Sequence, residues 1–301
     1  MREQQAPEAD EQHSDQHHEA HPRASLWAYV QERFPPLLVG MLAVSFGAGC
    51  VGLFGGRGMS RAFDWWMLGG FALLYVALLL RYRVVDEWKD FRHDARHYPD
   101  RPVPRGAISV RTLAILGIVA VTTELVLAIV LGGSRGLILY AVVTVLTVGT
   151  ATDFFAKAFF ERHFTISFLL HQVIYVPMFA WAALAMGASL GASSTWWGIA
   201  SLLCLFVSAE LVRKFKPRTS VEGGEVADTY GAVWGRRLAL IGTLALVLAA
   251  GWCAHVAAGS WVALGVSLLA AIVIATRSRS DAWVMAGAGA HVPLLALAMV
   301  W

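Results

Sequence analysis

The sequence predicts an all-α, multi-pass membrane protein with about nine transmembrane helices, and three observations lead to that prediction. Only 15% of the 301 residues are charged and 57% are hydrophobic, whereas soluble domains are nearer a quarter charged. The apolar residues form runs of about 20, the length that crosses the hydrocarbon core of a bilayer. Lysine and arginine gather in alternate connections between these runs. The net charge of +3 is mild and gives no reason to expect nucleic acid as a partner.

Nine predicted spans account for the apolar runs. Turn-forming residues separate some of them, notably Gly132-Gly133-Ser134 between the third and fourth spans and the stretch Gly187–Ser194 between the fifth and sixth. The fourth and eighth spans are short. In order, the predicted spans are Phe34–Phe54, Phe63–Val84, Val110–Leu131, Gly136–Thr152, Phe164–Gly187, Thr195–Val212, Leu238–Ala257, Trp261–Thr276 and Ala282–Val300.

The basic residues set the orientation of the spans, because cytoplasmic loops carry an excess of lysine and arginine. With the N-terminus in the cytoplasm, 21 of the 24 basic residues lie inside, with Arg81 counted in the loop after the second span. Only Arg57, Arg61 and Arg135 then lie outside. The C-terminus is outside as well, and we expect an integral protein of a bacterial inner membrane. An aromatic belt near the outer face is formed by Trp65, Trp66, Trp196, Trp197, Trp261 and Trp301.

Residues 1–24 differ from the rest and are expected to form a disordered tail ahead of one transmembrane domain, residues 25–301. The tail is rich in Glu, Asp, Gln and His and has no apolar run, so it is not a signal peptide. Its histidines suit either weak binding of a transition metal or, more simply, a solvated tail; they are His13, His17, His18 and His21. Three cysteines lie far apart in apolar runs and are interpreted as small buried hydrophobes: Cys50, Cys204 and Cys253.

The first long inner loop carries acids at a regular spacing. Asp86, Asp90 and Asp94 are four residues apart, so they line one face of a helix that continues from the second span. Like charges at that spacing destabilise a helix unless something positive lies against them. Mg²⁺ would do so, because it typically uses a few carboxylates together with substrate phosphate. The alternative is a solvated, charge-mixed helix end at the membrane surface.

The same loop closely resembles the first signature of the UbiA superfamily of prenyl-transferring enzymes. The chain reads Asp86-Glu87-x-x-Asp90-x-x-x-Asp94, followed by Arg101-Pro102-x-Pro104-x-Gly106. The family has Asn-Asp-x-x-Asp-x-x-x-Asp, followed by Arg-Pro-x-Pro-x-Gly, also between the second and third spans. Asp86 and Glu87 depart from this pattern, but each keeps or adds an oxygen ligand.

The second long inner loop leaves the family pattern. The family has Asp-x-x-x-Asp after the sixth span, whereas this chain has three acids at a spacing of three: Glu222, Glu225 and Asp228. Gly223-Gly224 between the first two acids favours a bent loop, which can converge carboxylates on one ion. The alternative is a flexible acidic loop that balances the neighbouring Arg and Lys.

The resemblance implies a role for individual residues. It implies one Mg²⁺ held by Asp86, Glu87, Asp90 and Asp94, and a second held by Glu222, Glu225 and Asp228. Lys157, in the third inner loop, matches a family lysine that helps to hold diphosphate, although Phe154 replaces the family's tyrosine and a simple positive-inside anchor is the alternative. Catalytic roles are assigned to Asp90, Asp94 and Lys157. Binding of the substrate diphosphate is assigned to Lys89, Arg101, Arg105, Arg213, Lys214, Arg218 and Tyr230.

A few polar residues lie within the predicted spans. Glu124 is a carboxylate deep in an apolar run, which by default marks a functional site that faces the interior of the bundle. A structural partner such as His171, in the fifth span, explains it equally well. His255 and His291 are placed near the outer ends of their spans and are expected to be interfacial or packing histidines.

The resemblance also implies the architecture and the activity. The expected fold is a bundle of nine helices around a lipid-accessible central cavity. The expected activity is Mg²⁺-dependent transfer of a prenyl group from an isoprenyl diphosphate to a lipophilic or aromatic acceptor, with membrane lipid around both. Three alternatives stay open: a terpene cyclase of the same superfamily, a transporter that uses Glu124 and the histidines, and a non-catalytic scaffold. The sequence leaves the acceptor, the length of the prenyl chain and the oligomeric state open.

Overall fold

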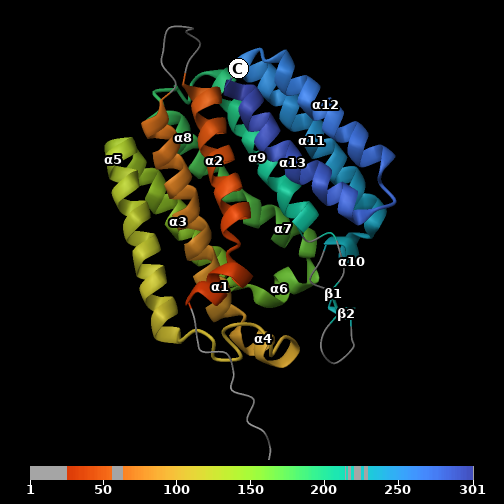
Figure 1. Cartoon of the computed structure of the whole chain (residues 1–301). Coiled ribbons are helices and arrows are strands. Elements are labelled where there is room, and N and C mark those ends of the chain that lie inside the picture. Colours follow the sequence, from red (N-terminus) through yellow and green to blue (C-terminus); the bar gives the residue numbers. More distant parts are fainter. Residues whose placement is uncertain are drawn as a thin grey trace, which may run out of the picture.

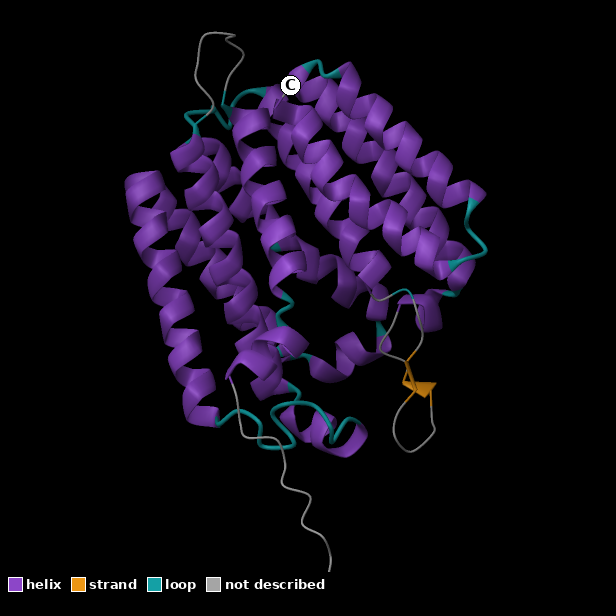
Figure 2. Ribbon diagram, in the orientation of Figure 1, coloured by secondary structure: helices purple, strands orange, loops and turns teal. Residues whose placement is uncertain are grey.

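The structure is a computed structural model that describes residues 26–55, 64–213, 215, 218–219, 225–226 and 230–300 (Figure 1). Apart from two strands of two residues each, its described elements are helices (Figure 2), so the prediction of an all-α fold is confirmed. The predicted tail, residues 1–24, lies outside the described residues, as do Lys214, Glu222 and Asp228.

The elements follow one another with short connections. The first half of the chain forms α1 (Leu26–Arg33), α2 (Pro36–Phe54), α3 (Trp65–Lys89), α4 (Phe91–His97), α5 (Val110–Ala151), the short turn η1 (Asp153–Phe155) and α6 (Lys157–Arg162). The second half forms α7 (Phe164–Val173), α8 (Tyr175–Ala185), α9 (Ser193–Arg213), β1 (Arg218–Thr219), β2 (Glu225–Val226), α10 (Tyr230–Trp234), α11 (Arg236–Ala258), α12 (Trp261–Thr276) and α13 (Asp281–Val300).

Seven helical segments in the described part of the chain are long and apolar enough to cross a membrane. One of them, Phe164–Ala185, combines α7 and α8, and α12 is a shorter apolar helix of 16 residues. The predicted third and fourth spans, which we placed on either side of Gly132-Gly133-Ser134, both lie within α5.

Helix α5 is a hairpin: its two helical halves meet at Gly133. The backbone of Gly133 has a φ of 57°, a conformation that favours glycine. The hydroxyl of Tyr140 donates a hydrogen bond to the carbonyl of Val121 at 3.3 Å. In a straight helix these residues would be about 28 Å apart along the axis, because each residue advances 1.5 Å. The chain therefore reverses at Gly133, where the sequence has its turn-forming residues.

An aromatic cluster fills the middle of the bundle. The ring of Phe46, on α2, lies 5.2 Å from Tyr75, 5.9 Å from Phe179 and 5.9 Å from Phe206, measured between centroids. These rings come from α3, α8 and α9, so one buried residue of α2 joins three other helices. Rings at such distances add to the stability that burial of their area provides. A second, smaller core joins α11, α12 and α13 through Val247, Ile274, Val284 and Ala288.

The two ends of the bundle differ in composition. The short elements α1, α4, α6, α10 and the strands lie together at the lower end in Figure 1. The N-terminal ends of α3, α9 and α12 lie at the upper end and carry exposed tryptophans: Trp65, Trp66, Trp196, Trp197 and Trp261. Five of the six tryptophans that we predicted for the outer face thus lie at one end of the bundle, although Trp27 and Trp88 are exposed near the other end.

Candidate active site

The first acidic motif lies where α3 ends and α4 begins. We expected one uninterrupted helix, but the helix is broken at Asp90, whose backbone has φ −93° and ψ 1°. Hydrogen bonds with helical spacing still cross the break, from Asp90 N to Asp86 O and from Asp94 N to Asp90 O, each at 2.8 Å. The chain therefore keeps a helical path through the motif while it bends at Asp90.

The four acids of the motif do not share one environment. Asp86 and Asp90 are exposed, whereas Glu87 and Asp94 are buried. A helix turns by about 100° per residue, so positions seven apart lie almost on the same line while positions eight apart diverge. Asp94 therefore falls near the face of Glu87 and away from the face of Asp86. We predicted that Asp86, Asp90 and Asp94 line one face of a continuous helix; the structure instead buries Asp94 and leaves Asp86 and Asp90 exposed, so the prediction is wrong for Asp94.

Two arginines bind the buried acids. Arg33 Nε lies 2.6 Å from Glu87 Oε1, and Arg33 Nη2 lies 3.9 Å from Asp94 Oδ2. Arg101 Nη1 lies 2.5 Å from the other carboxylate oxygen of Asp94. Burial of a carboxylate is unfavourable unless a cation and hydrogen bonds accompany it. The arginines therefore explain how two acids are buried at a membrane surface.

The exposed pair, Asp86 and Asp90, has the chemistry that suits Mg²⁺. Reduced contact with water, and then the charge of Asp86, raise the pKa of Asp90 above its ordinary value. A cation beside both carboxylates would relieve that repulsion. Within the described residues no three His, Cys, Asp or Glu side chains converge as a metal site. Mg²⁺ is commonly held by one or two carboxylates plus substrate phosphates, so the two exposed aspartates fit it in the presence of a diphosphate.

The Arg101–Gly106 segment closes the loop behind the motif. The guanidinium of Arg101 stacks on the ring of Tyr98 at 3.9 Å, and Arg105 forms two contacts with the carboxylate of Glu32 on α1, at 2.5 and 3.2 Å. Gly106 has a φ of 75°, a left-handed conformation that favours glycine, in the connection that leads into α5. Arg101 and Arg105, two of the four arginines that we assigned to diphosphate, are thus engaged in contacts within the protein.

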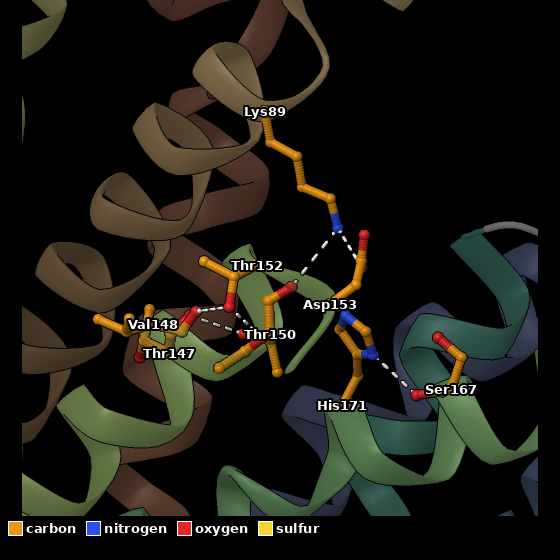
Figure 3. Close-up of polar contacts among 9 residues, drawn as sticks. Lys89, Thr147, Val148, Thr150, Thr152, Asp153, Ser167 and His171 are labelled. Carbon is orange, nitrogen blue, oxygen red and sulfur yellow. Dashed lines mark hydrogen bonds and ion pairs between the residues drawn. The ribbon is translucent and has the colours of Figure 1, made fainter. Parts of the chain in front are cut away.

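Lys89 joins the end of α3 to the turn that follows α5 (Figure 3). Its Nζ lies 2.6 Å from Asp153 Oδ1 and 3.4 Å from the carbonyl oxygen of Thr150. An ammonium group has three donors, so these two contacts leave a third for a ligand. Lys89 is thereby positioned at the same corner as Asp86 and Asp90.

The turn that receives Lys89 has an unusual backbone. Asp153, Phe154 and Phe155 have φ values of 47°, 48° and 59°, in the left-handed region that residues other than glycine rarely adopt. Gly149 makes room for this turn, because a Cβ there would lie 2.3 Å from the ring of Phe154. Strain of this kind concentrates at functional sites. Lys157 follows directly, as the first residue of α6; its side chain lies outside the described part of the structure.

The second loop is described only in part. Arg218 and Glu225 belong to a short antiparallel ladder in which Arg218 pairs with Val226 and Thr219 with Glu225. Glu225 is thus in an extended, hairpin-like segment at the same end of the bundle as α4 (Figure 1). Arg213 ends α9. The other residues that we assigned here, Lys214, Glu222 and Asp228, lie outside the described residues.

Tyr230, which we assigned to diphosphate binding, is buried within an aromatic cluster. Its ring stacks on Trp234 at 5.2 Å and meets Phe168 edge-on at 5.0 Å. Its hydroxyl donates a hydrogen bond to Glu210 Oε1 at 3.1 Å. Tyr230 thus ties α10 to α7 and α9, and its hydroxyl is engaged with Glu210.

The partner of Glu124 differs from our expectation. Arg81 Nη1 lies 3.2 Å from Glu124 Oε2, and both side chains are buried. His171 instead forms a hydrogen bond with the carbonyl of Ser167 at 2.7 Å (Figure 3). Arg81, which we counted in the inner loop, is buried in the bundle beside Glu124, so it was wrong to count it among the basic residues of the loop. The pair joins α3 to the first half of α5, and Arg81 also donates a hydrogen bond to Thr144 in the second half.

The two C-terminal histidines take part in packing. His255 is near the end of α11, as expected, and its ring lies 4.0 Å from that of Trp261. His291 is in the middle of α13 rather than near its outer end, is fully buried, and forms a hydrogen bond with Ser267 at 2.8 Å.

Comparison with known proteins assigns the family. The model of the UbiA prenyltransferase family matches residues 53–286, well over half of the chain, and the protein therefore belongs to that family. The apo structure of a UbiA homolog from Aeropyrum pernix K1 is similar in fold: it is 17% identical, the alignment covers 87% of this chain and 95% of that one, and the TM-score is 0.56. No curated protein matches. Membership implies transfer of prenyl groups within a membrane.

Two residues of the candidate site were absent from the sequence-based assignment. Arg33 was counted only as a basic residue near the N-terminus, and Asp153 only as part of a loop. Their partners are 54 and 64 residues away along the chain, and no local pattern indicates such pairs. The sequence held one signal for Asp153: this acid lies four residues before Lys157, which had already been assigned to the site.

Proposed function

We propose that the protein transfers a prenyl group from an isoprenyl diphosphate to a lipophilic or aromatic acceptor in a Mg²⁺-dependent reaction. The observation that supports this most directly is the exposed pair Asp86 and Asp90 beside Lys89, with Glu87 and Asp94 already bound to arginines. Two exposed carboxylates next to an ammonium group suit a metal–diphosphate complex. The family membership supports the same class of reaction.

The reaction requires the bond between the allylic carbon and the diphosphate oxygen to break. When bound, Mg²⁺ would supply positive charge to the departing diphosphate. Asp86 and Asp90 would hold the metal, and the third donor of Lys89 would contact a phosphate oxygen. Lys157, at the first position of α6, is proposed as a second cation for the leaving group. Such fixed charges stabilise the transition state because they are already oriented where negative charge develops.

The apolar bundle would receive the prenyl chain and keep water from the allylic cation. The acceptor would then attack the cationic carbon and lose a proton. Because Arg101 and Arg105 are bound to Asp94 and Glu32, we assign them to holding the loop in shape. Arg213, Lys214 and Arg218 remain the proposed diphosphate ligands from the second loop.

We further propose that Glu222, Glu225 and Asp228 hold a second Mg²⁺. The hairpin-like ladder around Glu225 brings this segment to the same end of the bundle as the first motif, which supports the proposal. Conversion of each acid to its amide, followed by titration of Mg²⁺, tests it. At least one variant should need more Mg²⁺ for half activity. Wild-type curves for E222Q, E225Q and D228N would contradict a metal at this place.

The overall proposal is tested with purified protein in lipid nanodiscs. The protein is incubated with Mg²⁺, a panel of radiolabelled isoprenyl diphosphates and a lipid extract as acceptor source. Prenylated acceptor and released diphosphate should appear in equal amounts and disappear with EDTA. Diphosphate release with a cyclic hydrocarbon and without acceptor would instead indicate a terpene cyclase. No release from any diphosphate would contradict both activities.

A further inference from the structure

Helix α1 lies outside the residues that match the family model, yet it contacts the first acidic motif directly. The match begins at residue 53, and α1 ends at Arg33. Figure 1 shows α1 beside the lower end of α3, near α4. Three of its residues reach the motif or the loop behind it: Tyr29, Glu32 and Arg33. The family pattern therefore does not account for these contacts.

Tyr29 anchors α1 by apolar packing. It is fully buried and belongs to a cluster with Val84, Val103, Ile108 and Leu113. These partners come from the last turns of α3, the connection between α4 and α5, and the start of α5. Burial against several elements fixes the position of a short helix that has little stability of its own. Burial, and then the charge of Glu87, raise the pKa of Tyr29 to about 12.

Arg33 then contacts both buried acids of the motif. Its side chain is 16% exposed, while those of Glu87 and Asp94 are 1% and 4% exposed. The planar guanidinium has donors on several sides, so one side chain lies 2.6 Å from Glu87 and 3.9 Å from Asp94. Removal of Arg33 would leave the buried Glu87 without this cation and Asp94 with Arg101 alone, and an uncompensated buried carboxylate is strongly unfavourable.

We propose that Arg33 is a positioning residue for the metal site, and that α1 acts as a strap across the first acidic motif. Arg33 holds Glu87 and Asp94 inward, which orients the bend at Asp90 so that Asp86 and Asp90 face outward together. This inference rests on the proposed function, because it assigns the outward pair to Mg²⁺. Groups that orient metal ligands from behind commonly change metal affinity by about 10- to 100-fold when they are replaced.

The experiment compares R33Q with E32Q, its neighbour on the same helix. Glu32 contacts Arg105 at the exposed side of α1, and exposed pairs contribute little. We expect R33Q to raise the Mg²⁺ concentration for half activity by about tenfold or more, with much of the rate recovered at saturating Mg²⁺. E32Q should stay within about twofold of the wild type. Amide hydrogen exchange over residues 86–97, the acidic motif itself, should become faster in R33Q and stay near the wild-type rate in E32Q, whose contact lies at Arg105.

A conservative variant covers the case in which R33Q does not fold. Arg33→Lys keeps a positive charge beside Glu87, but its single ammonium does not span both acids, so it should shift the Mg²⁺ curve in the same direction by less. A wild-type Mg²⁺ curve and exchange pattern in R33Q, or in R33K if R33Q is not obtained, would overturn the inference. Amide exchange can be measured without turnover. An inactive wild-type protein would therefore contradict the proposed function, while the exchange comparison would still test whether Arg33 positions the acidic motif.

Discussion

Lys89 Nζ lies 2.6 Å from Asp153 Oδ1, and this ion pair joins the last residue of α3 to the turn between α5 and α6. The contact links two segments that the chain separates by 64 residues. It places the ammonium group of Lys89 at the turn that directly precedes α6, the helix that begins with Lys157. The two inner connections are therefore in direct contact, as the proposed site requires.

The first prediction concerns Asp153. Replacement of Asp153 by Asn keeps the size of the side chain but removes the charge that orients Lys89. The pair is partly exposed, so its loss should weaken binding of the diphosphate by about 1 kcal/mol, which is about fivefold in KM. We expect kcat to change less than KM. Steady-state kinetics with varied isoprenyl diphosphate measure both, and an unchanged or lower KM would contradict the assignment.

The second prediction concerns the left-handed turn. Phe155 has a φ of 59° and is 87% exposed, so F155G removes backbone strain without opening a cavity. We expect the free energy of unfolding to rise by about 1 kcal/mol. Phe159→Gly, in the ordinary helix α6, is the matched control and should lower it by a similar amount. Thermal unfolding in detergent measures both variants, and a fall in both would show that the turn is unstrained.

The third prediction separates structure from chemistry for Glu124. E124Q leaves the buried Arg81 without a carboxylate and should destabilise the protein by about 3–5 kcal/mol. The double variant R81M/E124L replaces the pair with apolar side chains and should regain most of that stability. If the pair only joins α3 to α5, the double variant should also keep its activity. Stable but inactive R81M/E124L protein would instead assign the pair to the reaction.

The fourth prediction concerns orientation. Excess basic residues on one side predict a cytoplasmic N-terminus and an outer C-terminus. A reporter fused after Trp301 should be found outside the cytoplasm, and one fused before Ala24 inside. Arg81 no longer counts toward the charge bias, because it is buried within α3. The count is then 20 basic residues on the inner side and three on the outer side. Both reporters on the same side would contradict an odd number of crossings.

Much of the fold could be predicted because its signals are local. Apolar runs gave the helices to within a few residues, as for Phe34–Phe54 against Pro36–Phe54. Gly132-Gly133-Ser134 marked the reversal that the structure has at Gly133. Helix α1 was not predicted, because its eight residues are too few and too mixed to show a period and depend on Tyr29 for their position.

The candidate site was predicted less completely because its contacts are tertiary. The spacing identified the acids of the first motif. From the spacing alone, however, all four were assigned to the same metal ion: Asp86, Glu87, Asp90 and Asp94. Arg33 and Arg101 divide them into a buried pair and an exposed pair. The same holds for Glu124, whose partner Arg81 is on another helix and was assigned to a loop. Ion pairs between distant segments leave no periodic trace in a sequence.

The most direct test of the central claim is Mg²⁺-dependent prenyl transfer by D86N and D90N, with D100N as the control. Asp100 is an exposed acid of the same loop, and in the structure its backbone carbonyl accepts a hydrogen bond from Arg105. If the exposed pair holds the metal, D86N and D90N should lose at least about 100-fold in turnover at fixed Mg²⁺, while D100N stays near the wild-type rate. Wild-type turnover and Mg²⁺ dependence in both D86N and D90N would contradict the account.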